Sequence, residues 1–336
     1  MSQANEAVVV SGRVRLARNY FDLPFSNIKN PENAELCIER AQSAVSGEAD
    51  GFTLYKMKEM AELDQQKLVE KHLISRDLLK HADAGAALIR DDKHVSIMVN
   101  EEDHLRIQAI RPGFDLAVAA QDVFSLESKL ESVCTFSFDP QLGYLTSCPT
   151  NTGTGMRASL MMHLPLLTRY KQMGNVNQNV AKLGLTIRGI YGEGSDALGD
   201  LYQVSNQVTL GRTEEEIIEA VTGVGRQLIG METALRERAM KEKPTDWKDA
   251  LWRSYGILRY AVKMDEKEFM QHWSHLRLGT SMGIFHLSLK TVDDLLTVAQ
   301  EAHAQRYAQE FDAIESADEA RCMLIRGTLQ NNYQEE

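Results

Sequence analysis

Two arginines near the start of the chain have a spacing suited to phosphate binding. Residues 8–17, VVVSGRVRLA, alternate in polarity, which predicts a β-strand in which Arg13 and Arg15 share one face. Two adjacent guanidinium groups form a fork that matches the oxygens of a phosphate group. The same alternation is typical of a solvated strand face, so this pair alone leaves both interpretations open.

A polar cluster follows an apolar run within residues 97–106, IMVNEEDHLR. The run predicts a strand, and the cluster would emerge at its end. Its members are Asn100, Glu101, Glu102, Asp103 and His104. A carboxylate in this place could bind a cation, coordinate a metal or act as a base. A polar turn after an edge strand is the alternative.

The segment at 146–161, TSCPTNTGTGMRASLM, combines a cysteine, small residues and an arginine. Cys148 precedes a proline, so we expect it to be extended. The glycines lead to Arg157, which we expect at the start of a helix that begins near Met156. Backbone N–H groups at a helix start, with an arginine in the first turn, can hold an anion. A lone cysteine is more often a small buried apolar group than a reactive one.

A fourth segment, TIRGIYGEGSDA at 186–197, places Arg188 on a strand predicted over 182–192. Glu193 follows between Gly192 and Gly194. Glycines on both sides of a carboxylate allow a ligand to approach the backbone closely, although they also suit an ordinary turn.

The elements that must position these residues divide the chain into an α+β part and a helical part. Thr213 and Glu216 form a capping box that opens a helix to about Met240. The other expectations are helical structure over 32–82, β-structure over 84–150, a break or linker at 241–246, and helices beyond it. We therefore predict domains at 1–240 and 241–336.

Composition is that of a globular protein. The 336 residues carry 37 Lys+Arg and 48 Asp+Glu, a formal net charge of −11, which argues against a nucleic-acid partner. Four cysteines lie far apart without a CxxC pair, so neither a zinc cluster nor a disulfide framework is indicated. We find no signal peptide and no apolar run long enough to span a membrane. The expected location is the cytoplasm.

Taken together and in order, the four segments resemble the signature segments of the phosphagen (guanidino) kinase family. The matching stretches are SGRVRLARN, VNEEDHLRIQ, LTSCPTNTGTGMRASL and IRGIYGEGS, within about residues 8–240. The resemblance implies an α+β guanidino-kinase catalytic domain, with an antiparallel sheet flanked by helices, followed by a smaller all-helical C-terminal domain. It also implies transfer of the γ-phosphoryl group of ATP to a guanidinium nitrogen.

The first signature begins at Ser11, which leaves no room for the helical N-terminal domain of the kinases that act on small guanidines. With the helical C-terminal extension, this resembles the bacterial protein-arginine kinases (McsB type). The stretches LVEKHLIS at 68–75 and SNQVTLGRTEEEI at 205–217 are similar to that branch as well.

The resemblance implies an ATP site in which five arginines surround the phosphates and His72 lies at the nucleotide. Its implied residues are Ser11, Gly12, Arg13, Val14, Arg15, His72, Arg106, Arg157, Ala158, Ser159, Leu160, Met161, Arg188, Gly189, Ile190, Tyr191, Gly192 and Glu193. Mg²⁺ is implied together with ATP, without a dedicated protein ligand.

The resemblance also implies the catalytic groups. Glu102 matches the family's catalytic carboxylate, and Glu193 matches a second carboxylate that holds the guanidinium. A guanidinium has a pKa above 12, so a paired carboxylate is needed to orient its nitrogen and accept a proton. Cys148 matches a cysteine beside the guanidinium, where the arginines would favour its thiolate. We expect it to position the substrate rather than to form a covalent intermediate.

Two positions depart from the family patterns. Met161 stands where creatine and arginine kinases have a histidine, although the protein-arginine branch tolerates methionine there. In the phosphoarginine-binding motif RDxxRA of that branch, Asp318 and Arg321 are kept but the first arginine is Ala317. Loss of a bidentate guanidinium should weaken phosphoarginine binding and activation.

The leading hypothesis is a kinase for arginine side chains in proteins. The alternatives are a kinase for free arginine or another small guanidine, and a non-catalytic adaptor that reads phosphoarginine. The branch resemblance implies protein substrates with accessible arginines, a zinc-binding activator protein, a stress-response role with a Clp protease, and a homodimer.

Overall fold

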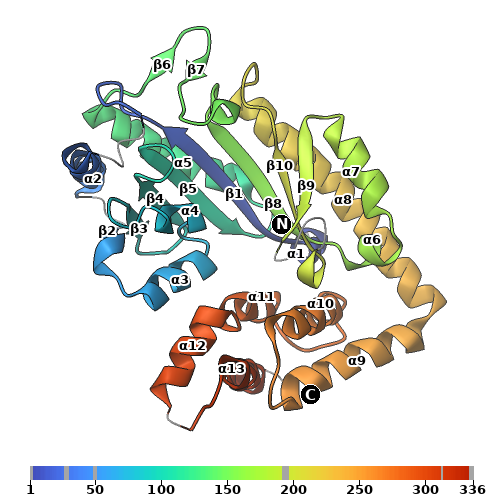
Figure 1. Ribbon diagram of the computed structural model, residues 1–336. Coiled ribbons are helices and arrows are strands. Elements are labelled where there is room, and N and C mark those ends of the chain that lie inside the picture. Colours follow the sequence, from blue (N-terminus) through green and yellow to red (C-terminus); the bar gives the residue numbers. More distant parts are fainter. Residues whose placement is uncertain (1–2, 26–29, 48–50, 191–196, 312, 333–336) are drawn as a thin grey trace.

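The chain is built around one antiparallel sheet, shown in Figure 1 as a computed structural model that describes residues 3–25, 30–47, 51–190, 197–311 and 313–332. In spatial order the strands are β2 (Phe52–Lys56), β3 (Ala86–Arg90), β4 (Val95–Val99), β5 (Leu105–Pro112), β1 (Val9–Arg18), β8 (Met156–His163), β10 (Leu201–Asn206) and β9 (Leu185–Gly189). A separate hairpin pairs β6 (Phe138–Asp139) with β7 (Gly143–Tyr144).

Helices cover one face of this sheet and leave most of the other face to the functional residues. The covering helices are α2 (Pro31–Val45), α5 (Leu116–Val133) and α8 (Glu214–Glu242). Val14, Leu16 and Leu160 are fully buried beneath them, as the alternation of β1 and β8 requires. The main core therefore fixes the side from which each strand presents its polar residues.

At one edge of the sheet, the opposite face is covered by a segment of the same part of the chain. The covering segment runs from residue 57 to residue 79 and includes α3 (Glu62–Glu70) and α4 (Arg76–Leu79). Met57, Leu78 and Met98 pack there in a small separate cluster. The other short helices are α1 (Gln3–Val8), α6 (Pro165–Arg169) and α7 (Met173–Ala181).

The C-terminal part, residues 244–332, is a helical region whose core also includes Leu166, Leu201 and Ala239 of the preceding part. It contains α9 (Pro244–Tyr260), α10 (Glu266–Ser281), α11 (Leu289–Val298), α12 (Glu301–Glu310) and α13 (Ala317–Asn332). Trp273 is fully buried at its centre, and its indole N–H donates to the carbonyl of Val292 over 2.8 Å. The break that precedes α9 is at Lys243, within the segment where the sequence predicts one.

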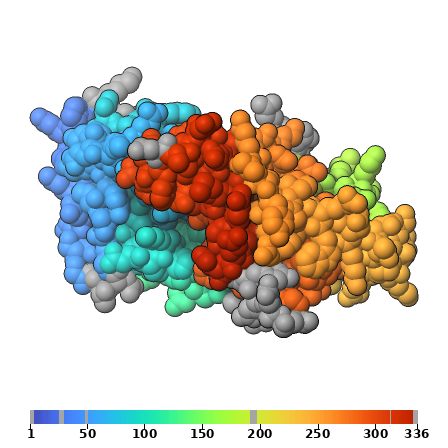
Figure 2. Space-filling view, turned by 90° about the horizontal axis from the view of Figure 1, so that it is seen from below, coloured from blue at the N-terminus to red at the C-terminus, as the bar shows by residue number. Residues whose placement is uncertain are grey.

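Buried arginines connect the helical region to α8 and to the start of the chain. Arg277 of α10 donates to the carbonyl of Ala7 over 2.6 Å. Arg236 of α8 donates to the same oxygen over 3.0 Å and to the hydroxyl of Ser281 in α10 over 3.1 Å. Arg277 also pairs with Asp293 of α11 at 2.7 Å. These bonds place α10 beside α1. Figure 2 shows the red end of the helical region lying against the light-blue part of the chain.

Two of the predicted elements are wrong in part. The stretch 32–82 is not continuously helical, because β2 forms within it and pairs with β3. The stretch 84–150 is not uniformly β, because it contains α5, whose buried residues Leu116, Ala119 and Val123 recur at helical spacing. Asp115 caps this helix by accepting from the Val118 N–H, a signal that the sequence contained.

The expected helix at Met156 is also wrong, because this segment is β8. Its residues are good helix formers, but β1 and β10 lie on either side and satisfy its backbone hydrogen bonds as a central strand. Ala158 and Leu160 face the core while Arg157 and Ser159 face the other side, a period-two alternation. By contrast, the capping box at Thr213 and Glu216 is confirmed.

The close packing of α8 on the sheet predicts different effects for two neighbouring glycines. A Cβ added at Gly225 would lie 2.5 Å from Leu160 Cδ1, whereas Gly223 has no atom within 4 Å. Both substitutions to alanine gain helix propensity, up to about 1 kcal/mol. Overpacking opposes this gain at Gly225 by about 1–3 kcal/mol.

We therefore expect Gly223→Ala to raise the free energy of unfolding and Gly225→Ala to be less stable than Gly223→Ala. Urea unfolding followed by circular dichroism measures both. Equal stabilities of the two variants would contradict the close helix–sheet contact.

Candidate active site

Five arginines from four strands share the sheet face opposite the main core. Side chains that lie directly opposite each other in antiparallel strands are on the same face. Arg15 of β1 is opposite Gln108 of β5 and opposite Arg157 of β8. The same register relations, extended through β10 to β9, join Arg13, Arg15, Arg106, Arg157 and Arg188 into one set. The structure thus brings together arginines that are up to 175 residues apart, from position 13 to position 188.

These guanidinium groups are close enough to affect one another's ionisation. Burial lowers the pKa of Arg15 well below its ordinary value, and the charges of Arg13, Arg106 and Arg157 lower it further. The pKa of Arg157 is lowered by burial and then by Arg188 and Arg106. Among the described residues, Nε of Arg15 is buried without a hydrogen-bond partner. Such a cluster of donors is suited to a polyanion.

Glu101 holds one of these arginines in place. Nη1 of Arg106 donates to both carboxylate oxygens of Glu101, each at 2.6 Å. The hydroxyl of Ser75, the N-cap of α4, also donates to this carboxylate. Glu101 is only 1% exposed, so its charge is directed at Arg106 rather than at solvent. This supporting role of the first acid was not predicted from the sequence.

Glu102 and Cys148 lie together at the edge of the arginine cluster. The thiol of Cys148 donates a hydrogen bond to the Glu102 carboxylate. Partial burial raises the pKa of Glu102, the negative charge of Asp103 raises it further, and Arg106 opposes the rise. A carboxylate with a raised pKa beside several cations can accept a proton and orient a cationic group.

Asp103 fixes this arrangement from below. One of its carboxylate oxygens accepts from Nδ2 of Asn19 and from the backbone N–H of Ser147, both at 2.6 Å. Asn19 in turn accepts from the N–H of His104 at 2.9 Å. The buried carboxylate of Asp103 therefore connects three segments: the end of β1, the turn after β4 and the loop that carries Cys148.

Two glycines allow the chain to turn between Cys148 and the start of β8. Gly153 has φ of +115°, and a Cβ there would lie 2.5 Å from the carbonyl oxygen of Thr209. Gly155 has φ of +61°, and its Cβ would lie 2.7 Å from the carbonyl oxygen of Ala17. Only glycine fits both the left-handed backbone and the close approach at these positions.

A cavity of about 590 Å³ opens over the arginine face, between the sheet and the helical region. The predicted ATP residues that line it are Ser11, Arg13, Arg15, His72, Ser159, Met161 and Ile190. Its lining also contains Gln66, Glu70, Gln108, Gln203, Glu266, Gln300 and Glu301, which were not predicted. Gln108 and Gln203 could have been found from strand register, because they are the partners of Arg15 and Arg188. For the cavity residues that come from helices, no local sequence pattern indicates that they line this cavity.

The remaining predicted residues fall into three groups. The side chains of Val14, Ala158 and Leu160 are on the opposite, core-facing side of the sheet, and Gly12 shares that side without a side chain. Gly189 ends β9 next to Arg188. Tyr191, Gly192 and Glu193 lie outside the described residues.

Asp318 and Arg321 are in α13, away from the sheet. Arg321 is fully buried and donates to Asp318 Oδ1 over 2.6 Å.

In the described parts of the chain, no group of three or more His, Cys, Asp and Glu side chains could hold a metal ion. Likewise, none of the described helices is long and apolar enough to cross a membrane.

Comparisons with known proteins match both parts of the chain. Residues 34–235 match the family model of the ATP:guanido phosphotransferase C-terminal catalytic domain, and residues 244–336 match that of the protein-arginine kinase McsB C-terminal domain. A protein-arginine kinase of Caldanaerobacter subterraneus is 47% identical over 91% of this chain and 92% of its own length. One from Geobacillus stearothermophilus is 42% identical over 97% of this chain and 91% of its own length.

Solved structures of guanidino kinases share the fold. Lombricine kinase superimposes with a TM-score of 0.61 and 25% identity, covering 69% of this chain and 68% of that protein. The duplicated taurocyamine kinase of Schistosoma mansoni gives a TM-score of 0.62 and 28% identity, covering 75% of this chain and 38% of that protein.

The position of His72 predicts that it is uncharged near neutral pH. It lies two residues beyond the end of α3 and has φ of +57°, an uncommon backbone conformation for a residue other than glycine. Burial lowers its pKa to about 4, and the charges of Arg13 and Arg76 contribute. The unfolded chain, with a histidine pKa near 6.5, binds this proton more tightly than the folded chain does.

Stability should therefore fall as the pH drops from about 6.5 toward about 4. We expect this loss to be smaller in His72→Gln, and the comparison isolates His72 from the other buried histidines. Urea unfolding at several pH values measures the difference, and NMR of the ring reports the charge directly. A His72 ring that titrates near pH 6.5 would contradict the prediction.

Proposed function

This chain belongs to the ATP:guanido phosphotransferase family and is a protein-arginine kinase, and we propose that phosphoryl transfer takes place at the arginine-bearing face of its sheet. The observation that carries this proposal is the gathering of five arginines on one sheet face, with Glu102 and Cys148 in contact beside them. Two of these arginines, Arg13 and Arg15, line the cavity. The cationic face suits a triphosphate, and the carboxylate suits a guanidinium.

The arginines bind and screen the triphosphate in this proposal. Arg15 and Arg157 lie at the centre of the cluster, where their donors would contact phosphate oxygens. Neutralising those oxygens reduces their repulsion of an incoming nucleophile and stabilises charge in the transition state. Glu101 keeps Arg106 directed toward the same place. Mg²⁺ would be held through the phosphates and water, and it would supply further neutralisation of phosphate charge.

Glu102 orients the substrate guanidinium and accepts a proton from its nitrogen as transfer proceeds. Its raised pKa favours proton acceptance, and the thiol of Cys148 contacts the same carboxylate. Cys148 positions the guanidinium from the loop side without forming a covalent bond. Glu193 is proposed as the second carboxylate on the family resemblance alone.

The substrates are arginine side chains of proteins, and free arginine or another small guanidine is the alternative substrate class. We further propose a cytoplasmic enzyme that marks proteins for a Clp-type protease in the stress response, with a zinc-binding activator and as a homodimer. The support for these partners is the similarity to protein-arginine kinases over nearly the whole chain. The proposed division near residue 240 is supported by the break at Lys243 and by a second apolar cluster that consists mainly of residues beyond it.

We propose that phosphoarginine activates this enzyme weakly. Arg321 uses its guanidinium for internal contacts, to the carbonyls of Met264 and Ala299 and to Asp318 and Glu301. With Ala317 in place of the first arginine of the motif, both guanidinium groups of RDxxRA are missing or engaged. This arrangement supports a reduced affinity for phosphoarginine.

Glu102→Gln should lower kcat at least about 100-fold, because general-base contributions are typically 10²–10⁴. In the unsubstituted enzyme, kcat/KM should fall as the pH drops through the raised pKa of Glu102, above the ordinary 4.5. A coupled assay of ADP release measures both quantities. Full activity in Glu102→Gln, with circular dichroism unchanged, would remove the assignment.

Protein and free substrates are distinguished by incubating the enzyme and Mg-ATP with casein, or with free arginine at equal guanidine concentration. Mass spectrometry under conditions that preserve the acid-labile P–N bond locates the phosphate. We expect phosphoarginine in casein and none from free arginine. Phosphorylation of free arginine alone would support the small-guanidine alternative.

A further inference from the structure

The helical region forms the second wall of the cavity above the arginine face. Glu266 at the start of α10 and Gln300 and Glu301 at the start of α12 line the same 590 Å³ space as Arg13 and Arg15. In Figure 1 these helices face the open side of the sheet, and α12 packs against α3. The cavity is thus enclosed by two parts of the chain that are far apart in sequence.

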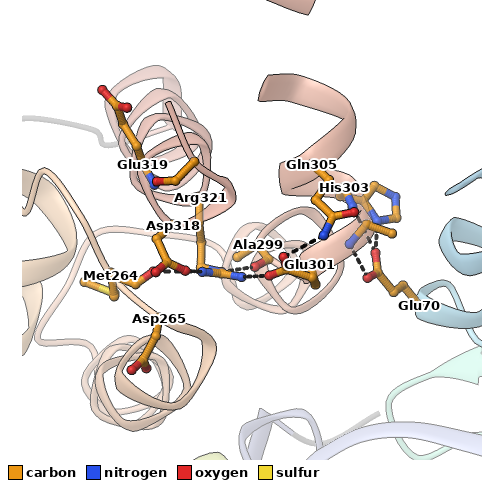
Figure 3. A network of polar contacts seen from close by, with 12 residues as sticks. Glu70, Met264, Asp265, Ala299, Glu301, His303, Gln305, Asp318, Glu319 and Arg321 are labelled. Atoms are coloured by element: carbon orange, nitrogen blue, oxygen red, sulfur yellow. Dashed lines mark hydrogen bonds and ion pairs between the residues drawn. The ribbon is translucent and has the colours of Figure 1, made fainter. Parts of the chain in front are cut away.

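One carboxylate from the catalytic part joins the two walls. Glu70, the last residue of α3, accepts hydrogen bonds from the backbone N–H groups of Ala302 and His303 at 2.6 and 3.1 Å, and it contacts His303 Nδ1 at 2.5 Å (Figure 3). The first N–H groups of a helix need external acceptors. Gln300, the N-cap of α12, makes no side-chain cap bond, so Glu70 caps this helix from another element.

A buried arginine holds the same turn from behind. Arg321 donates to the carbonyl of Ala299 over 2.6 Å and to Oε2 of Glu301 over 2.7 Å, as Figure 3 shows. It is fully buried, so these bonds are made in a region of low dielectric. The turn at 299–301 is therefore fixed between Arg321 on one side and Glu70 on the other.

Glu70 is also close in sequence to His72, the histidine that is expected at the nucleotide. Glu70 precedes His72 by two residues, and both line the cavity. The backbone N–H of His72 donates to the carbonyl of Val69 over 2.8 Å, in the turn that ends α3. A displacement of α12 would consequently affect the turn that carries His72.

The charges of the two walls differ, and this difference indicates which end of a nucleotide each wall fits. Arg13 and Arg15 suit phosphates, whereas the helical wall presents the carboxylates of Glu266 and of Glu301, the latter paired with Arg321. Ribose hydroxyls and the exocyclic amino group of adenine are hydrogen-bond donors that suit carboxylate and amide oxygens. The helical wall is matched to the nucleoside end.

We propose that residues 300–301 and Glu266 of the helical region complete the nucleoside end of the ATP site, and that Glu70 is the positioning residue that holds this wall over it. The inference rests on the proposed assignment of the cavity as the nucleotide site. The helical region then contributes directly to substrate binding, in addition to any role in regulation or association.

A bulky residue in the wall tests the placement. Gln300→Trp should weaken Mg-ADP binding at least about tenfold, equivalent to about 1.4 kcal/mol, because the indole would occupy part of the cavity. Gln309→Trp, on an exposed position of the same helix, is the matched control and should bind Mg-ADP normally. Isothermal titration calorimetry measures both. An unchanged Kd in Gln300→Trp would overturn the proposal.

The role of Glu70 is tested with a probe that lacks the nucleoside. Glu70→Ala should weaken Mg-ADP binding about tenfold but leave Mg-tripolyphosphate binding unchanged, because tripolyphosphate contacts only the arginine wall. Glu62→Ala, an exposed acid on the same helix, is the charge-matched control. An equal loss for both probes would show general damage to the site and would overturn the positioning role.

Arg15→Ala separates this inference from the proposed function. It should weaken both probes, because it removes a phosphate contact. If it does so while Gln300→Trp and Glu70→Ala bind Mg-ADP normally, the proposed role of the helical wall in nucleoside binding is wrong, and the assignment of the phosphate site is retained. If Arg15→Ala binds both probes normally, the assignment of the cavity itself fails.

Discussion

The repulsion among five guanidinium groups on one sheet face is the constraint on which the rest of this structure depends. The charges of Arg13, Arg106 and Arg157 lower the pKa of Arg15, and those of Arg188 and Arg106 lower the pKa of Arg157. The face holds together because the side chains are anchored on four strands whose other side is a large apolar core. The folding energy of that core stabilises an arrangement that is unfavourable without an anion.

The acids around the cluster are used unequally, which follows from their positions at the end of β4. Glu101 points inward and neutralises Arg106, Asp103 binds two segments of backbone and side chain, and Glu102 alone remains exposed beside Cys148. Three consecutive carboxylates therefore have three different partners. The left-handed backbone of Asn100, with φ of +60°, begins the turn that separates their directions.

The sequence contained enough information to predict the chemistry but not all of the fold around it. The alternation of β1 and the capping box of α8 are local patterns, and both elements are as expected. The strand β8 was mistaken for a helix because its propensity is helical while its conformation is set by β1 and β10, which are distant in sequence. The residues of the helical wall could not be predicted for the same reason. Nothing in the sequence around Gln300 indicates that it lines the same cavity as Arg13.

The two attachments of the helical region differ in kind, and this difference bears on how it could act on the site. At one end, Arg277 is fully buried and donates to the carbonyls of Ala7 and Glu6, so opening this contact would break two hydrogen bonds of a guanidinium in the interior. At the other end, α12 is held by Glu70, whose side chain is 12% exposed, through two backbone N–H groups and one imidazole. When this contact opens, the partly exposed carboxylate can accept hydrogen bonds from water instead, whereas the fully buried Arg277 cannot donate to water in the same way. Any change that the helical region transmits to the cavity should therefore arise at α12, with α10 acting as the fixed support.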